Sequence, residues 1–132
     1  MRIALFSFAV FLLMGITACN STNNTSASAN GQGIYKVISP ADFKAGLAAN
    51  AAQLQLIDVR TPQEVAAGAI EGSANLDFNA AGFKEKIEAL DKEKPVHLYC
   101  ASGGRSGKTL KMMQNMGFKE VYDLKGGYSN WK

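Results

Sequence analysis

The sequence predicts an α/β domain with a mostly parallel central sheet of about five strands and helices on both faces. Two observations support this prediction. From residue 34 onward, short runs rich in Ile, Val, Leu and Tyr alternate with segments of helical periodicity, and such alternation is typical of βαβ units. The chain is also 132 residues long and 47% hydrophobic. That size and composition suit one small domain, which we place at residues 34–132.

The first half of this domain is expected to contain three strands and two helices. The strands are the alternating run 34–38, the strongly apolar run 54–59 and the brief run 74–76. Ser39 and Pro40 supply an N-cap and a proline at the first helical position, so a helix should run to about Ala49. Residues 61–64 (Thr-Pro-Gln-Glu) form a capping box. The short helix that they start should stop by Gly68.

The second half is expected to contain two further helices and two further strands. In chain order these are a helix over 83–90, a strand over 96–99, a helix over about 106–116 and a last strand that begins at Val121. Apolar residues recur at helical spacing in both helices. Pro95 directly precedes the strand that starts at 96, and Gly117 ends the longer helix.

The loop after the strand 96–99 combines several features that activate a thiol. Cys100 lies where the strand ends, which is the usual ligand-binding edge of an open α/β sheet. Gly103 and Gly104 allow the backbone N–H groups to form a concave anion-binding nest. Arg105 and the start of the next helix add positive charge, which favours thiolate over thiol.

Cys100 is therefore the candidate catalytic nucleophile. The candidate substrate-binding residues are the rest of its loop: Ala101, Ser102, Gly103, Gly104, Arg105 and Ser106. The alternative interpretation is a buried structural cysteine followed by an ordinary turn. His97 is three residues away, but a core histidine is favoured over a Cys–His catalytic pair. Asp58 and Arg60 are expected to secure the end of the strand before them, and a substrate role for Arg60 stays open.

Charge is unevenly distributed and limits the classes of partner. Six basic and two acidic residues follow Tyr99, whereas the stretch 19–99 holds seven basic and nine acidic residues. A basic half that contains the nucleophile suits a small anionic substrate. The alternative is a solvated helix face, because Lys108 and Lys111 are spaced for one. Aromatic residues do not interleave with the lysines, so nucleic-acid binding is not expected.

The N-terminus has the features of an export signal. Arg2 is followed by an almost wholly apolar stretch, 3–14, that is short for a membrane span. Residues 16–19 (Ile-Thr-Ala-Cys) resemble the lipobox of bacterial lipoproteins. This resemblance implies a signal peptide over 1–18, a lipid on Cys19 and a membrane-anchored protein whose domain lies in the periplasm. The polar, uncharged stretch 19–33 is then a flexible tether. The alternative is a plain secretory signal.

Three motifs in order resemble the single-domain rhodaneses, a sulfurtransferase family, and exported members of the phage-shock type in particular. The motifs are residues 57–64 with 68–75, residues 99–106 (Tyr-Cys-Ala-Ser-Gly-Gly-Arg-Ser) and residues 124–131 (Leu-Lys-Gly-Gly-Tyr-Ser-Asn-Trp). The family usually has histidine where this chain has Ala69, a position regarded as structural. The resemblance covers 34–132 and implies a rhodanese-like fold.

The resemblance also implies a reaction. Cys100 would take sulfur from a small anionic donor such as thiosulfate, become a persulfide and pass the sulfur to a thiol or cyanide. It implies no metal and no organic cofactor, and we expect a monomer. Four residues separate Cys100 from Arg105, whereas phosphatases of this fold have five, so an arsenate or phosphate enzyme is disfavoured. The main alternative is a persulfide carrier or interaction module that serves one partner.

Overall fold

The computed structural model describes residues 33–131 and contains one sheet of five parallel strands. The strands are β1 (Ile34–Ile38), β2 (Gln55–Asp58), β3 (Ala74–Asn75), β4 (Val96–Tyr99) and β5 (Glu120–Leu124). Their order across the sheet is β1-β5-β4-β2-β3, and every neighbouring pair is parallel. The predicted fold class is confirmed, with a sheet that is wholly rather than mostly parallel.

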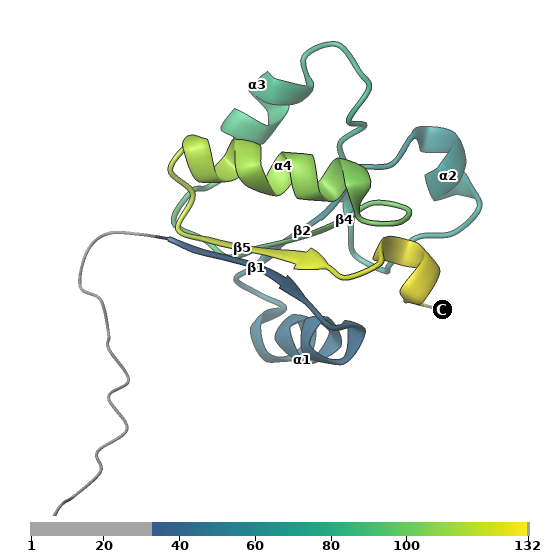
Figure 1. The fold of residues 1–132 in the computed structure, drawn as a ribbon, viewed down its shortest axis with the longest axis horizontal. Helices are drawn as coiled ribbons and strands as arrows, with labels where there is room; N and C mark the ends of the chain where they lie inside the picture. Colours follow the sequence, from purple (N-terminus) through teal and green to yellow (C-terminus); the bar gives the residue numbers. More distant parts are fainter. Residues whose placement is uncertain (1–32, 132) are drawn as a thin grey trace, which may run out of the picture.

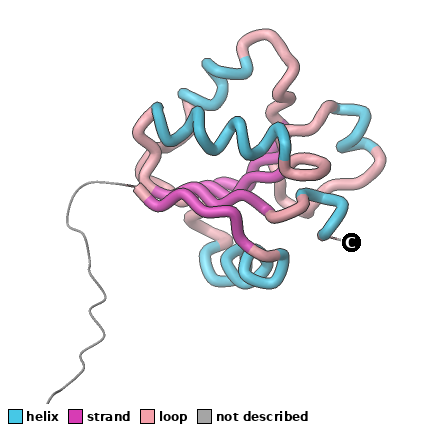
Figure 2. The backbone as a smooth tube through the Cα atoms, in the orientation of Figure 1, coloured by secondary structure: helices cyan, strands magenta, loops and turns pink. Residues whose placement is uncertain are grey.

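Helices cover both faces of the sheet (Figure 1). Helix α1 (Pro40–Asn50) packs on one face, and α3 (Phe83–Glu88) and α4 (Gly104–Asn115) lie on the other. The short helix α2 (Pro62–Ala66) and the 3-10 helix η1 (Gly127–Asn130) both lie at the end toward which the strands run. Figure 2 shows loop segments on both sides of α2 at this end.

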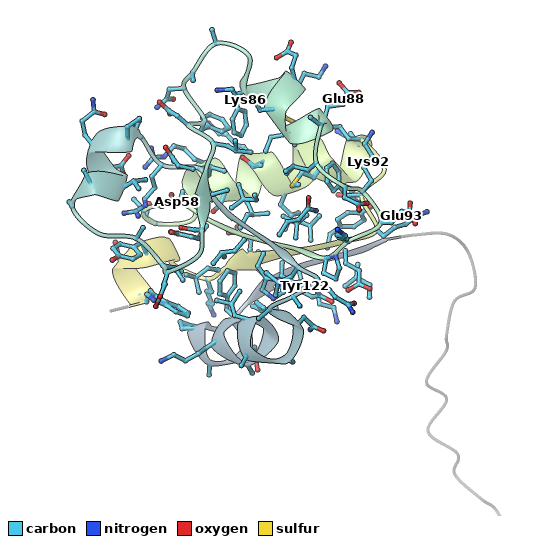
Figure 3. All side chains as sticks on the ribbon, turned by 180° about the vertical axis from the view of Figure 1, so that it is seen from behind. Asp58, Lys86, Glu88, Lys92, Glu93 and Tyr122 are labelled. Carbon is cyan, nitrogen blue, oxygen red and sulfur yellow. The ribbon has the colours of Figure 1, made fainter. Side chains whose placement is uncertain are left out.

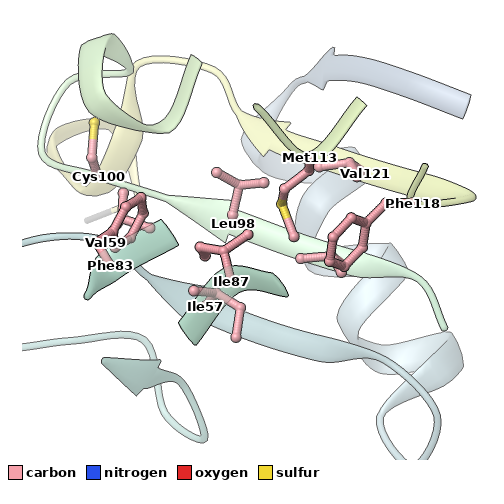
Figure 4. Close-up of a cluster of buried hydrophobic side chains, with 10 residues drawn as sticks. Ile57, Val59, Phe83, Ile87, Leu98, Cys100, Met113, Phe118 and Val121 are labelled. Atoms are coloured by element: carbon pink, nitrogen blue, oxygen red, sulfur yellow. The ribbon is translucent and has the colours of Figure 1, made fainter. Parts of the chain in front are cut away.

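Two buried clusters fill the space between the sheet and its helices. The larger lies on the α3 and α4 side and includes Ile57, Leu98, Cys100, Met113 and Val121 (Figure 4). The smaller lies on the α1 side and is made of Phe43, Leu56, Ile70, Tyr99 and Leu124. Successive residues of β4 and β5 alternate between the clusters because side chains alternate along a strand. The apolar runs of the sequence are therefore buried on both sides.

Most element boundaries agree with the sequence-based expectation. The side chain of Ser39 accepts a hydrogen bond from the Asp42 N–H at the start of α1, and the capping box of Thr61 and Glu64 is present at α2. The start of α4 is a correction, because the helix begins at Gly104 and not near Ser106. Gly103 has φ of 102°, which turns the chain into the helix at once and places Arg105 in its first turn.

The expectations for the N-terminal segment lie outside the described residues. These are the signal peptide over 1–18, the lipid on Cys19 and nearly all of the tether over 19–33. Among residues 33–131 no helix is long and apolar enough to cross a membrane.

Candidate active site

The sulfur of Cys100 lies inside the loop that joins β4 to α4. The Gly103 N–H donates to Cys100 Sγ at 3.0 Å, and the Ser106 hydroxyl donates at 3.4 Å. The residue is only 1% exposed, and its sulfur points away from the rest of the apolar cluster toward the start of α4 (Figure 4). The side chain thus belongs to the core while its reactive atom faces polar donors.

Hydrogen bonds decide the acidity of this thiol. Burial alone would raise the pKa of Cys100, because a thiolate is poorly solvated inside a protein. The Ser106 hydroxyl and the backbone N–H groups of Ser106, Ser102 and Gly103 all favour the thiolate. Together they outweigh burial, and the pKa of Cys100 is lowered. An inert structural cysteine in an apolar site would show the opposite shift.

Arg105 forms a two-pronged ion pair with Glu64 of α2. Its Nη1 lies 2.8 Å from Glu64 Oε2, and its Nη2 lies 2.6 Å from Glu64 Oε1. Hydrogen bonding to Arg105 is the main reason that the pKa of Glu64 falls to about 2, and the Thr61 N–H contributes. The guanidinium also interacts with Cys100. Arg105 therefore ties the cysteine loop to α2 and keeps positive charge beside the sulfur.

A second, buried ion pair holds the polypeptide around α2. Arg60 Nη2 lies 2.7 Å from Asp58 Oδ2 and also donates to the Gly68 carbonyl at 2.8 Å. The Arg60 guanidinium stacks on the ring of Tyr128, 4.2 Å from its centroid. The expected supporting role of Asp58 and Arg60 agrees with these contacts, which join β2, the end of α2 and η1.

The segment after β5 fixes the first residues of the cysteine loop. The Tyr128 N–H donates to the Cys100 carbonyl at 2.8 Å, and Ser129 donates to the Ala101 carbonyl from both its N–H (3.0 Å) and its hydroxyl (2.9 Å). Gly127 permits this approach, because its φ is 62° and a Cβ there would lie 2.5 Å from the Cys100 oxygen. The third family motif, residues 124–131, thus holds the start of the cysteine loop in place.

The six predicted loop residues lie together but do different things. Ser102, Gly103 and Ser106 direct donors at the sulfur, whereas the Ala101 carbonyl is used by Ser129. Gly104 is exposed at the helix start, and Arg105 pairs with Glu64. Sequence reasoning assigned Glu64 only to the capping box. Arg105 lies 41 residues after Glu64 in the chain, and no local sequence pattern predicts a contact over that separation.

His97 lies apart from Cys100, on the other face of the sheet. It is 3% exposed, and its ring packs between Phe43 and Tyr122 with centroid distances of 5.0 Å to each. Burial lowers the pKa of His97. The core interpretation is confirmed. In residues 33–131 no group of three or more His, Cys, Asp or Glu side chains is placed to hold a metal ion.

A cysteine with a lowered pKa lies at the carboxyl end of a parallel sheet, cradled by backbone N–H groups and a helix start, and such an arrangement allows its sulfur to act as a nucleophile. A family model for the rhodanese-like domain matches residues 39–132. The chain belongs to the rhodanese-like family.

Relatives in this family have names that indicate several activities. The chain is 38% identical over 97 residues to the putative sulfurtransferase YtwF of Bacillus subtilis, covering 74% of this chain and 90% of that protein. It is 33% identical over 78 residues to the thiosulfate sulfurtransferase GlpE of Pseudomonas aeruginosa, covering 59% and 69%. It is also 36% identical over 77 residues to a tRNA uridine(34) hydroxylase of Pelagibacter ubique, covering 58% of this chain and 26% of that protein.

The fold has a solved counterpart as well. The crystal structure of a rhodanese-related protein from Thermoplasma volcanium matches with a TM-score of 0.62 at 30% identity, covering 74% of this chain and 90% of that one.

Proposed function

We propose that this protein is a sulfurtransferase that carries sulfane sulfur as a persulfide on Cys100. The observation that carries the proposal is the position of Cys100 Sγ, which receives hydrogen bonds from the Gly103 N–H and the Ser106 hydroxyl and has a lowered pKa. Relatives named as sulfurtransferases support the same class of reaction.

The proposed first step forms the persulfide. The Cys100 thiolate attacks the outer sulfur of a small anionic donor such as thiosulfate. A bond forms between the two sulfurs, the sulfur–sulfur bond of the donor breaks, and sulfite leaves with the electron pair. The loop N–H groups and the start of α4 stabilise negative charge on the transferred sulfur. Because Glu64 occupies the guanidinium fork of Arg105, Arg105 acts chiefly by organising the loop and by its charge.

The proposed second step removes the transferred sulfur from Cys100. A thiolate or cyanide attacks the outer sulfur of the persulfide, the bond to Cys100 breaks, and the Cys100 thiolate is regenerated. Two half-reactions through one covalent intermediate predict ping-pong kinetics. Cys100 is the nucleophile of the first step and the leaving group of the second, and its loop supplies the hydrogen-bond donors for both.

Intact mass spectrometry of the full chain tests the proposal. After incubation with thiosulfate and removal of the donor, the wild-type protein should gain the mass of one sulfur atom, and the Cys100→Ser protein should gain none. Cys19→Ala is the matched control and should load like the wild type. Equal labelling of the wild type and Cys100→Ser would contradict the assignment of Cys100.

The low exposure of Cys100 favours one alternative, a persulfide carrier that meets its donor or acceptor inside a protein complex. The same preparation distinguishes the two functions. An enzyme of the proposed kind turns over with thiosulfate and cyanide alone, whereas a partner-dependent carrier does so only when the partner is added.

A further inference from the structure

Asp123 is a buried carboxylic acid packed against the first turns of α4, and the proposed sulfur-transfer chemistry does not use it. It lies on β5 in register with Leu98 of β4, and its side chain is 2% exposed. Alternation along β5 places it on the same face as Val121, toward α4. A Cβ on Gly107 would stand 3.8 Å from Asp123 Oδ2, so the carboxyl lies against the first turns of α4.

This carboxyl lacks the partners that a buried charge requires. Asp123 Oδ1 accepts no hydrogen bond, and no cation among residues 33–131 forms an ion pair with Asp123. The ionisable groups of the elements packed on this face are Tyr35 of β1, Cys100 after β4, Arg105, Lys108 and Lys111 of α4, and Lys84, Glu85, Lys86 and Glu88 of α3. Arg105 is held by Glu64, and the lysines and the α3 carboxylates are exposed.

The environment favours the neutral acid. Burial raises the pKa of Asp123 to about 6, although hydrogen bonds from the Ser106 hydroxyl and the Leu124 N–H act in the opposite direction. An uncompensated buried carboxylate is costly. A buried acid that titrates near neutral pH beside a reactive group is a candidate for a functional role.

The Ser106 hydroxyl connects this acid to the sulfur. Ser106 is fully buried and donates to Cys100 Sγ at 3.4 Å. Its neighbour Gly107 lies against Asp123 Oδ2, and hydrogen bonding to Ser106 acts to lower the pKa of the Asp123 carboxyl. A serine hydroxyl has a single proton to donate. It can donate to the sulfur or to a carboxylate oxygen, but it cannot satisfy both at one time.

We propose that Asp123 is a positioning residue that sets the direction of the Ser106 hydroxyl and so controls the hydrogen bonding of the Cys100 sulfur. When Asp123 holds its proton, it donates to Ser106 Oγ, and Ser106 donates to the sulfur anion. When Asp123 is ionised, Ser106 donates to the carboxylate and the sulfur loses this donor. The three groups Asp123, Ser106 and Cys100 thus hold one negative charge, either on the sulfur or on the carboxylate. The proposal rests on the proposed function of Cys100.

The test follows the alkylation of Cys100 in the full chain as a function of pH, with site-resolved mass spectrometry of the Cys100 peptide. Asp123→Asn keeps the shape of the acid, removes its charge and can still donate to Ser106. Its alkylation midpoint should fall by about one pH unit, which is about tenfold more thiolate below the midpoint. Ser106→Ala should raise the midpoint. When Asp123→Asn is introduced into the Ser106→Ala protein, the midpoint should shift by less than half as much as it does in the protein that keeps Ser106.

Two controls make the result specific. Glu120→Gln removes a carboxylate from the same strand. Glu120 accepts a hydrogen bond from the Tyr122 hydroxyl on the other face of the sheet, so this variant should leave the midpoint unchanged. Thermal unfolding checks that each variant is folded, and Asp123→Ser replaces Asp123→Asn if that protein does not fold. An unchanged midpoint in Asp123→Asn, or an equal shift with and without the Ser106 hydroxyl, would overturn the proposal. Alkylation of Cys100 requires no sulfur transfer. A failure of the proposed function would therefore show as a failure of persulfide loading, and a failure of the Asp123 proposal would show in the alkylation midpoints.

Discussion

At the scale of single residues, Cys100 is governed by a balance between burial and hydrogen bonding. A thiol that is 1% exposed would normally be a poor acid. Charge-assisted hydrogen bonds to an anion contribute roughly 1.5–3 kcal/mol each, so a few N–H and O–H donors are sufficient to reverse the effect of burial. The activation of Cys100 is therefore a property of the loop backbone and of Ser106, and a change in loop conformation should remove it.

Arg105→Ala tests the part played by the guanidinium. Its removal takes a positive charge away from Cys100 and leaves the Glu64 carboxylate without its cation, which disfavours the thiolate and weakens the attraction for an anionic donor. We expect the second-order rate of persulfide formation to fall by about 10- to 100-fold. Lys111→Ala removes an exposed charge from the same helix and should have little effect.

Glu64→Gln separates the two contributions of this ion pair. Glutamine can still accept one hydrogen bond from Arg105 and leaves the positive charge beside Cys100, so we expect a loss of less than about threefold, equivalent to less than about 0.7 kcal/mol. Similar losses in Arg105→Ala and Lys111→Ala would show that general positive potential, and not this guanidinium, assists the reaction.

At the scale of elements, the site depends on segments that are far apart in the chain. The strand β4 delivers Cys100, and the loop after it supplies N–H groups together with the start of α4. Helix α2 holds Arg105 through Glu64, and η1 binds the first carbonyls of the loop. The η1 contact requires a glycine, because Gly127 combines a positive φ with close approach to the Cys100 and Ala101 backbone.

Gly127→Ala should therefore be severe. Alanine at positive φ costs about 1–2 kcal/mol, and relief of the clash with the loop costs roughly 1–3 kcal/mol more. We expect a clear fall in the unfolding temperature and loss of persulfide loading. Gly72→Ala is the matched control, since φ is 79° there and nothing lies within 4 Å of the added Cβ. If the two variants lose equal stability and both still load, the contact with η1 is not required for the site.

The sequence predicted the elements better than it predicted the contacts among them. Periodicity, the capping box and glycines depend on neighbours in the chain, and they located all five strands and the four α-helices to within a few residues, whereas η1 was not predicted. The start of α4 differed because glycine has a poor helix propensity, and Gly104 enters the helix only through the turn at Gly103. The pairing of Arg105 with Glu64 and of Ser106 with Asp123 depends on tertiary packing, which local patterns do not encode.

At the scale of the whole molecule, the chemistry gathers at one end of the sheet. Parallel strands share a carboxyl edge, so Asp58, Cys100 and the turn after β5 meet there. Lys92 and Glu93 lie at the opposite end from Asp58 (Figure 3). The first strand, β1, begins at Ile34, at the end of the sheet away from Cys100.

The anchor itself is a prediction of the sequence. Cys19 follows Ile-Thr-Ala in a pattern that resembles a lipobox. In a bacterial host, Cys19→Ala should block labelling with a radioactive fatty acid and leave the precursor uncleaved by the lipoprotein route. Recovery of wild-type protein in the soluble periplasmic fraction without lipid would show that residues 1–18 are an ordinary signal peptide.

If Cys19 is acylated, Cys100 is the single free thiol of the mature protein, and the catalytic cycle must depend on an external acceptor. No cysteine of the same chain can then attack the persulfide to form a disulfide and release sulfide. We expect the persulfide to persist under anaerobic conditions after the donor is removed, because the loop donors stabilise its anion.

Addition of cyanide or a small thiol should discharge this persulfide. With thiols, the rate should follow the thiolate fraction and nucleophilicity of the acceptor. The measurement is a mass time course on the loaded Cys19→Ala chain, in which Cys100 is the single thiol, with and without acceptor. Rapid loss of the extra sulfur without acceptor, and without dimer formation through Cys100, would contradict a stable carrier intermediate. It would favour a module whose loop holds sulfur only inside a complex, because the isolated loop would then lack the donors that the anion needs.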